Sequence, residues 1–154
     1  MARDHGISQG TEERYAKGNW RYEIKFVGWH MKNTYVVAAI GLEQLKKLDR
    51  LNEKRQKIIE HHNKNLNLDR KGNHLYWIIV QNRDEFVEKM KQEGISVSVH
   101  FLPLHQMPAF KDYPHEQLNN TEYFGQRLVS LPLYPQMTLK QIDFISKAVL
   151  KYAK

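Results

Sequence analysis

A long, proline-free series of apolar residues occupies the chain between Thr34 and Asn63. Its members recur at spacings near three, four and seven, the period of a helix with one apolar face: Val37, Ile40, Leu45, Leu48, Leu51, Ile58 and Ile59. Asn33 and Thr34 are both suitable N-cap residues at its start. The pattern predicts one helix over 34–63, about 45 Å long at 1.5 Å per residue. We expect a helix of this length to bridge two bodies or to pack across a dimer.

Shorter elements follow this helix and end in a proline-rich stretch and a final helix. The expected elements are a loop over 63–73, a buried strand over 75–80, a helix over 82–93, an alternating strand over 95–101, a helix over 117–128, an extended segment over 130–135 and a last helix from Thr138 to about Tyr152. In the alternating strand Ser96, Ser98 and His100 share the polar face. The fold class is therefore α/β, a small α+β domain in which one long helix leads into a small sheet covered by helices.

Composition excludes several classes of protein and leaves one alternative open. The 154 residues carry 24 Lys and Arg against 17 Asp and Glu, a net charge of +7. These cations are spread over every segment, which favours a solvated surface, but a basic nucleic-acid-binding domain stays a possible alternative. No apolar run has the 18 or so residues that a membrane span needs. Without cysteine there is no disulfide or thiolate metal site, and we expect a cytoplasmic protein.

Histidines are the main candidates for chemistry, because no Gly-rich phosphate loop, G-x-S-x-G elbow or H-E-x-x-H motif occurs. His100 and His105 stand in the segment V-H-F-L-P-L-H, where they could bind an anionic or hydroxylated ligand, act in acid–base chemistry, or be ordinary loop histidines. No third ligand lies close in sequence, so no metal site is predicted. The adjacent His61 and His62, on the charged helix, are expected on the solvated surface.

Several short motifs occur together in a fixed order along the chain. They are D-H-G-I-S (4–8), R-Y (14–15), W-R-Y-E (20–23), G-W-H-M-K-N-T-Y-V-V-A-A-I-G-L-E-Q-L-K-K-L-D (28–49), V-H-F-L-P-L-H (99–105) and S-L-P-L-Y-P-Q-M-T (130–138). This ordered set resembles the DegT/DnrJ/EryC1/StrS family of sugar aminotransferases over essentially the whole chain. The resemblance implies the carboxy-terminal portion of a fold-type-I aminotransferase. Residues 1–33 are then a remnant of the large domain, and residues 34–154 form the small domain, including the linking helix 34–63.

The resemblance also implies a cofactor, substrates and partners. The complete enzyme would use pyridoxal phosphate (PLP) to move an amino group from glutamate onto a keto nucleotide-sugar. It would work as a homodimer, or this chain would pair with an amino-terminal half, without nucleic acid or membrane. By position in the motifs, the cofactor phosphate would contact His30, Lys32 and Asn33. The substrate would contact His100, His105, Arg14, Trp20 and Tyr22.

The sequence departs from the family pattern at the residue that carries the chemistry. The family's Schiff-base lysine lies in an S-x-H-x-x-K segment upstream of H-G-I-S, and none of the lysines here stands in that context. We therefore expect no catalytic residue in this chain and no transamination by it alone. The loop 63–73 is also shorter than the family's connection, which normally contains an extra strand. An alternative function is a non-catalytic dimeric module that binds nucleotide sugars or regulates a full-length relative.

Overall fold

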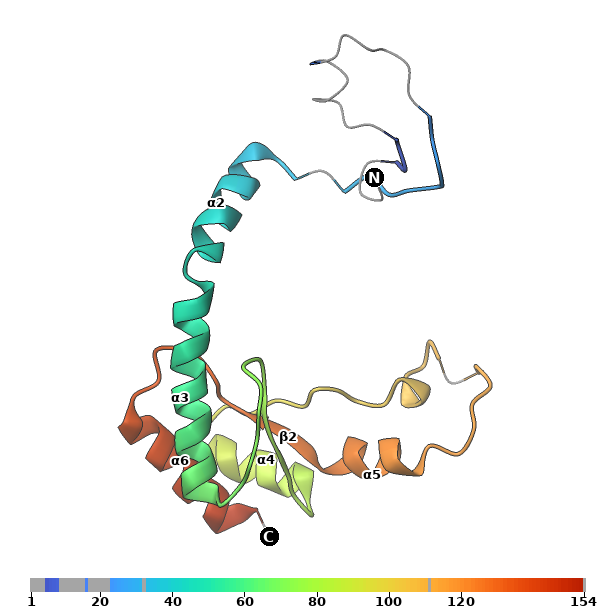
Figure 1. Cartoon of the computed structure of the whole chain (residues 1–154). Helices are drawn as coiled ribbons and strands as arrows, with labels where there is room; N and C mark the ends of the chain where they lie inside the picture. Colours follow the sequence, from blue (N-terminus) through green and yellow to red (C-terminus); the bar gives the residue numbers. More distant parts are fainter. Residues whose placement is uncertain (1–4, 9–15, 17–22, 32, 111, 154) are drawn as a thin grey trace. The chain divides into compact units, whose positions relative to one another are not determined.

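The computed structural model of the protein describes residues 5–8, 16, 23–31, 33–110 and 112–153. The chain divides into two compact units, Met1–Lys47 and Leu48–Lys154 (Figure 1). Together the described helices and the antiparallel strand pair confirm the predicted α/β class. No helix in this described part is both long and apolar enough to cross a membrane.

In the first unit, a tight turn at His5–Gly6 pairs with the segment around Ile24. Ile7 and Ile24 form an antiparallel bridge, and the N–H of Lys25 donates to the carbonyl of Gly6 (2.9 Å). Gly6 has φ +74°, and a Cβ at this position would lie 1.8 Å from the carbonyl oxygen of Phe26. Only glycine fits this close approach, which explains the glycine of the D-H-G-I-S motif.

The predicted long helix is present in two segments. Helix α2 covers Tyr35–Leu45 and helix α3 covers Leu48–Leu66, with a turn at Lys46–Lys47. Thr34 caps α2, because its side chain accepts from the N–H of Val37 (3.3 Å). At the turn, the N–H of Lys47 bonds the carbonyl three residues back, on Gln44 (3.0 Å), instead of four. The periodicity continues across the turn, so it could not reveal this interruption.

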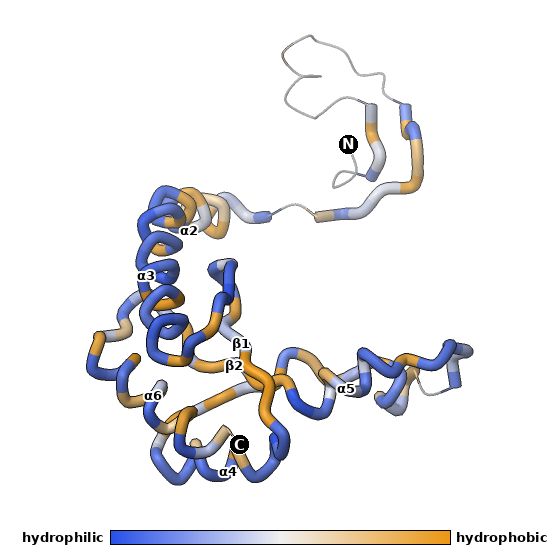
Figure 2. Tube along the Cα trace, turned by 60° about the horizontal axis from the view of Figure 1, so that its bottom comes forward, coloured by the Kyte–Doolittle hydropathy of each residue, from blue (hydrophilic) through white to orange (hydrophobic). Residues whose placement is uncertain are grey.

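The apolar residues of α2 are exposed, whereas those of α3 enter a core. No residue of α2 is buried, and Tyr35 and Val36 are 91% and 70% exposed. Figure 2 shows apolar residues along this exposed helix. In α3, by contrast, Ile58 and Ile59 are buried. Burial therefore begins only in the second half of the predicted helix.

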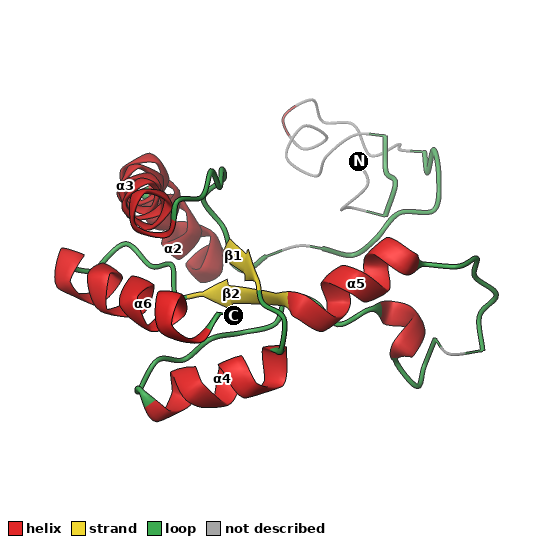
Figure 3. Cartoon of the chain, turned by 90° about the horizontal axis from the view of Figure 1, so that it is seen from below, coloured by secondary structure: helices red, strands yellow, loops and turns green. Residues whose placement is uncertain are grey.

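The second unit contains a small antiparallel sheet with helices packed around it (Figure 3). After α3, the elements in chain order are β1 (Tyr76–Ile79), α4 (Arg83–Gln92), the 3-10 turn η1 (Leu104–Gln106), α5 (Asn119–Arg127), β2 (Leu128–Leu131) and α6 (Leu139–Tyr152). Both α3 and α4 pack against α6. The core consists of apolar side chains from α3, β1, α4, β2 and α6 and from the segments that join them: Ile58, Ile59, Tyr76, Ile78, Val80, Phe86, Met90, Ile95, Val129, Leu131, Met137, Ile142, Ile145, Ala148 and Val149.

Strand β1 pairs with β2 in the register Tyr76–Leu131, Trp77–Ser130, Ile78–Val129 and Ile79–Leu128. The predicted strand over 95–101 is present only as a single antiparallel bridge between Ser98 and Ser130, on the other side of β2. Pro103, two residues beyond this segment, has no N–H to donate, so the pairing does not continue past it. The predicted strand over 75–80 is confirmed.

Local caps set the start and the end of α4 and the start of α6 at the residues that the sequence predicts. Asn82 caps α4, and Gly94 with φ +76° ends it: the N–H of Ile95 reaches the carbonyl of Met90 (2.8 Å). At α6, the side chain of Thr138 accepts from the N–H of Gln141 (3.3 Å), and the Gln141 side chain accepts from the N–H of Thr138 (2.9 Å). This reciprocal pair is a capping box.

One asparagine closes the short connection between α3 and β1. The side chain of Asn63 donates to the carbonyl of Arg70 (2.9 Å) and accepts from the N–H of Arg70 (3.0 Å) and from the hydroxyl of Tyr76 (3.0 Å). The Arg70 guanidinium lies 3.6 Å above the ring of Trp77. The base of this loop is therefore fixed to the helix before it and the strand after it.

Candidate functional site

His100 lines a cavity beside the sheet. It follows the bridge in which the N–H of Ser98 donates to the carbonyl of Ser130 (3.0 Å) and the N–H of Ser130 donates to that of Ser98 (2.7 Å). The cavity has a volume of about 200 Å³, and its polar lining consists of His74, Ser96, Ser98, His100 and Ser130. The predicted polar face of the segment 95–101 therefore does gather Ser96, Ser98 and His100 around one space. Sequence reasoning missed Ser130 and His74, which come from β2 and from the loop before β1.

The ring of His100 is half-buried. Its Nδ1 is shielded from solvent, and no hydrogen-bond partner for it exists within the described parts of the chain. An unpaired buried ring nitrogen is costly, because it has lost its bonds to water without replacement. A bound group that reached this nitrogen would restore the missing hydrogen bond.

His105 lies in a second and separate cavity. It belongs to η1, and its side chain is mostly buried. Its Nε2 lies 3.3 Å from a carboxylate oxygen of Glu122 on α5, and its ring centroid lies 5.0 Å from that of His115. The cavity has a volume of about 550 Å³ and is lined mainly by apolar and aromatic side chains, among them Leu104, His105, Phe110, Tyr113, Pro114 and Leu118.

The two histidines that the sequence groups together thus line different spaces. Between them, Pro103 packs against α5: a Cβ on Gly125 would lie 2.4 Å from Cγ of Pro103. Arg83 also donates a hydrogen bond to the carbonyl of Gly125. The packing of Pro103 on Gly125 holds the proline-rich segment beside α5. His105 therefore faces Glu122, while His100 stays beside β2.

Two of the three predicted cofactor contacts are described. His30 is exposed, and its ring stacks on that of His5 at a centroid distance of 4.9 Å and an angle of 13°. Asn33 is exposed just before the cap of α2. Within the described residues, neither side chain is buried or hydrogen-bonded, so this part of the chain does not by itself enclose a cofactor phosphate. Lys32, Arg14, Trp20 and Tyr22 lie outside the described residues.

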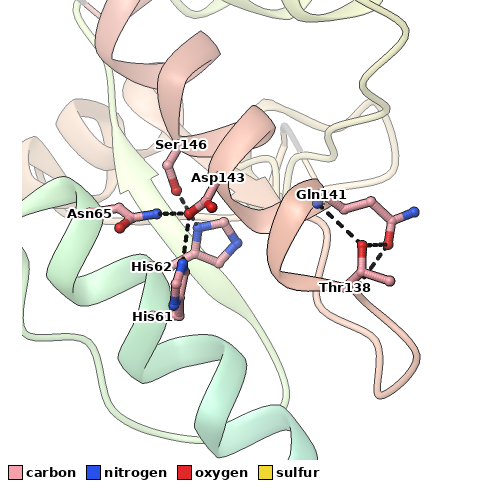
Figure 4. A network of polar contacts seen from close by, with 7 residues as sticks. All are labelled: His61, His62, Asn65, Thr138, Gln141, Asp143 and Ser146. Carbon is pink, nitrogen blue, oxygen red and sulfur yellow. Dashed lines mark hydrogen bonds and ion pairs between the residues drawn. The ribbon is translucent and has the colours of Figure 1, made fainter.

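The prediction of a solvated histidine pair is wrong for His62. Its side chain is fully buried between α3 and α6, where Nδ1 lies 3.0 Å from the hydroxyl of Ser146 (Figure 4). The half-buried His61 donates from Nε2 to the carboxylate of Asp143 (2.7 Å), which also accepts from Asn65 (2.9 Å). Adjacent helical residues point about 100° apart. The ring of His62 therefore faces the core, and the ring of His61 faces Asp143 on α6.

Burial changes the acid–base chemistry around His62. Loss of solvent, with a smaller contribution from the neighbouring His61, lowers the pKa of His62 from 6.5 to about 4, although Asp143 acts in the opposite direction. Its ring lies 4.9 Å from that of Tyr76, and burial raises the pKa of that phenol to about 12. Both groups are therefore neutral near pH 7, which suits them to the core. The described part of the chain contains no group of three His, Asp or Glu side chains placed to hold a metal ion.

Two curated proteins with similar sequences are longer than this chain. It is 33% identical over 173 residues to the protein MJ1066 of Methanocaldococcus jannaschii, a match that covers 98% of this chain and 45% of that protein. It is 31% identical over 173 residues to the spore coat polysaccharide biosynthesis protein SpsC of Bacillus subtilis, covering 97% of this chain and 44% of SpsC. The chain thus spans less than half the length of these curated relatives. Both alignments are longer than its 154 residues, so the relatives carry residues that it lacks.

Solved structures share the fold at lower identity. DesV of S. venezuelae, solved in complex with a ketimine intermediate, aligns with a TM-score of 0.80 and 22% identity over 100% of this chain and 43% of DesV. PseC of Helicobacter pylori, an aminotransferase involved in the biosynthesis of pseudoaminic acid, aligns with a TM-score of 0.77 and 23% identity over 99% of this chain and 44% of PseC. The sequence model of the DegT/DnrJ/EryC1/StrS aminotransferase family matches residues 1–150. The chain therefore belongs to this family.

Proposed function

We propose that this chain is the carboxy-terminal part of a PLP-dependent aminotransferase that transfers an amino group from glutamate to a keto nucleotide-sugar. The match of the family model to residues 1–150 carries the proposal. SpsC, a spore coat polysaccharide biosynthesis protein, and DesV, solved with a ketimine intermediate, support a sugar aminotransferase. In the complete enzyme the cofactor would supply the electron sink, and the protein would position the substrates. We place this activity in the cytoplasm.

In this function, the chain would supply only part of the catalytic site. The sequence contains no S-x-H-x-x-K segment, and the described His30 and Asn33 do not enclose a phosphate on their own. We therefore propose that the chain alone does not transaminate and that a lysine-bearing amino-terminal part completes the site. In this assignment residues 1–33 belong with the large domain, and residues 34–154 form the small domain.

One feature of the described residues supports association with such a part, and two histidine cavities bear on substrate binding. The apolar side chains of α2 are exposed, and a lysine-bearing part or a second copy of the chain would remove them from water. His100 lines a cavity with its Nδ1 unpaired in the described chain, and we assign it to substrate binding. His105, in its own cavity, would contact another portion of the same substrate.

Reconstitution tests the proposal. The chain would be co-expressed with the lysine-bearing amino-terminal half of a family member such as SpsC, and the purified pair would be examined for cofactor absorbance and glutamate-dependent amination of keto nucleotide-sugars. We expect activity from the pair and none from either half. The matched control replaces the Schiff-base lysine of the added half with alanine. A soluble, folded pair that neither associates nor shows cofactor absorbance would contradict the proposal.

A non-catalytic role is the second candidate, and one observation favours it. The His100 cavity and the core of the Leu48–Lys154 unit form from this chain's residues alone. Such a unit could bind a nucleotide sugar without the lysine. Calorimetry of the isolated chain with nucleotide sugars separates the two functions: binding together with an inactive reconstituted pair would favour the binding module.

A further inference from the structure

Ser130 sits at the floor of the His100 cavity with an unsatisfied hydroxyl. It is 3% exposed, and its Oγ has no hydrogen-bond partner in the described part of the chain. Its backbone is fixed on both sides, because Ser130 pairs with Trp77 of β1 and with Ser98. The side chain of Ser130 therefore stays on this buried face of β2, where water does not reach it.

A second unpaired atom belongs to another residue that lines the same cavity. Nδ1 of His100 is also shielded from solvent and without a partner among the described residues. Buried polar groups in folded proteins are nearly always paired with protein or with bound water or ligand. Two such groups around one space of about 200 Å³ indicate that a polar guest completes their hydrogen bonds.

The remaining polar residues that line the cavity indicate what kind of ligand fits it. Ser96, Ser98 and His74 are exposed, so the cavity opens to solvent on their side. The described residues that line it include three hydroxyls and two imidazoles but no Asp or Glu. Hydroxyl and imidazole groups can all donate hydrogen bonds. The described lining has no carboxylate that would neutralise a cation or repel an anion. Donors without a neighbouring carboxylate favour an oxyanion.

The volume of the cavity narrows the range of possible ligands further. The volume is below the 300–1,000 Å³ or so of pockets that enclose whole drug-sized ligands. It is several times the roughly 30 Å³ that one water molecule takes in the liquid. The space therefore suits one compact group, such as a phosphate or a carboxylate, and not a complete nucleotide.

We propose that the serine–histidine pocket formed by Ser96, Ser98, His100, Ser130 and His74 binds an oxyanion. Only the source of this anion rests on the function proposed above: a phosphate group of the nucleotide sugar or a carboxylate of glutamate. The hydroxyl of Ser130 and Nδ1 of His100 donate from the floor, and the exposed hydroxyls of Ser96 and Ser98 donate from the rim. Their role is to hold and orient the charged group, and no bond is made or broken there.

Titration of the isolated full chain tests the pocket. Inorganic phosphate, acetate and the neutral sugar glucose would be added separately, at constant ionic strength, while calorimetry and the ¹⁵N-edited NMR signals of the histidine rings are followed. We expect phosphate or acetate to bind with a shift of the His100 signal, and glucose to leave it unchanged. UDP and glutamate form two further arms that identify the source of the anion. Absence of anion binding, which would leave only water in the pocket, would overturn the proposal.

Variants tie the binding to the named atoms. Ser130→Ala should weaken anion binding about tenfold, because a hydrogen bond to a charged group is lost. The matched control, Ser8→Ala, changes a serine outside this unit and should leave the affinity unchanged. If Ser130→Ala fails to fold, His100→Asn and His100→Ala replace it as a pair, since the asparagine amide keeps a donor near the position of Nδ1. Equal affinity in all variants would refute the assignment, whatever the outcome of reconstitution.

Discussion

Acid should destabilise the Leu48–Lys154 unit through a single buried imidazole. In the unfolded chain His62 takes up a proton near pH 6.5, but in the folded chain it does so only near pH 4. Between these pH values the unfolded state binds more protons, so the free energy of unfolding falls as the pH falls. The contribution of neutral His62 is fully present above pH 6.5 and is lost progressively down to about pH 4.

The size of this loss follows from the pKa difference. One pKa unit corresponds to 1.36 kcal/mol, so the complete effect is about 3 kcal/mol. Between pH 7 and pH 5 the expected loss is about 2 kcal/mol. This pH interval lies above the range in which two hydrogen-bonded carboxylates take up protons, because both have lowered pKa values. They are Asp143, bonded by His61 and Asn65, and Glu93, bonded by Tyr152 and Lys151. Their contributions are present above their ordinary pKa values and are lost only at lower pH.

Urea unfolding of the wild-type chain and of His62→Asn at a series of pH values measures the effect. Asparagine can keep a bond to Ser146 from the position of Nδ1 but does not titrate, although its smaller volume costs stability at every pH. Circular dichroism and tryptophan fluorescence report unfolding, and Trp77, in the strand beside the network, contributes to this fluorescence together with Trp20 and Trp29. The other histidines are common to both proteins, so their contributions cancel in the difference.

We expect the stability difference between wild type and His62→Asn to shrink by about 2 kcal/mol from pH 7 to pH 5. Parallel pH profiles for wild type and His62→Asn would refute the reasoning, because they would show that His62 titrates alike in the folded and unfolded chain.

Three further substitutions test the packing and the caps. Phe86→Ala should cost about 3–5 kcal/mol in urea unfolding, because it empties a buried aromatic site, and a loss below 1 kcal/mol or so would contradict the described core. Thr138→Ala removes the capping box of α6 and should cost about 1 kcal/mol in the same assay, with Thr121→Ala as the control. Gly6→Ala should disrupt the turn at His5–Gly6 through its clash with the Phe26 carbonyl, seen as faster amide exchange at Lys25, and unchanged exchange would speak against the turn.

Local sequence signals predicted the elements that depend on neighbouring residues. The N-caps Thr34, Asn82 and Thr138 and the helix end at Gly94 each involve side-chain or backbone bonds within a few positions. The apolar run before Asn82 likewise became β1, since a short stretch of β-branched and aromatic residues favours a buried strand. Such features need no knowledge of the tertiary fold.

Two of the predictions that failed depended on partners distant in sequence. His62 follows Ile58 and Ile59 at spacings of four and three, so the buried face of α3 continues through it. That signal was present, but a polar residue type led to the opposite expectation, and the partner Ser146 lies 84 positions away. The segment 95–101 alternates like a strand, yet only Ser98 pairs with β2. Of the site, the sequence predicted His100 and the shared face of Ser96 and Ser98, but not Ser130.

The asparagine that closes the connection between α3 and β1 makes that connection a natural point for changes in chain length. Asn63 bonds both Arg70 and Tyr76, so the loop beyond Arg70 begins and ends at anchored positions. Doubling the length of a flexible loop adds only about 0.6 kcal/mol of closure cost. Extra residues between Arg70 and His74 would therefore extend outward from a clamped base. Members of the family could gain or lose a strand there while the sheet register and the packing of α3 on α6 stay the same.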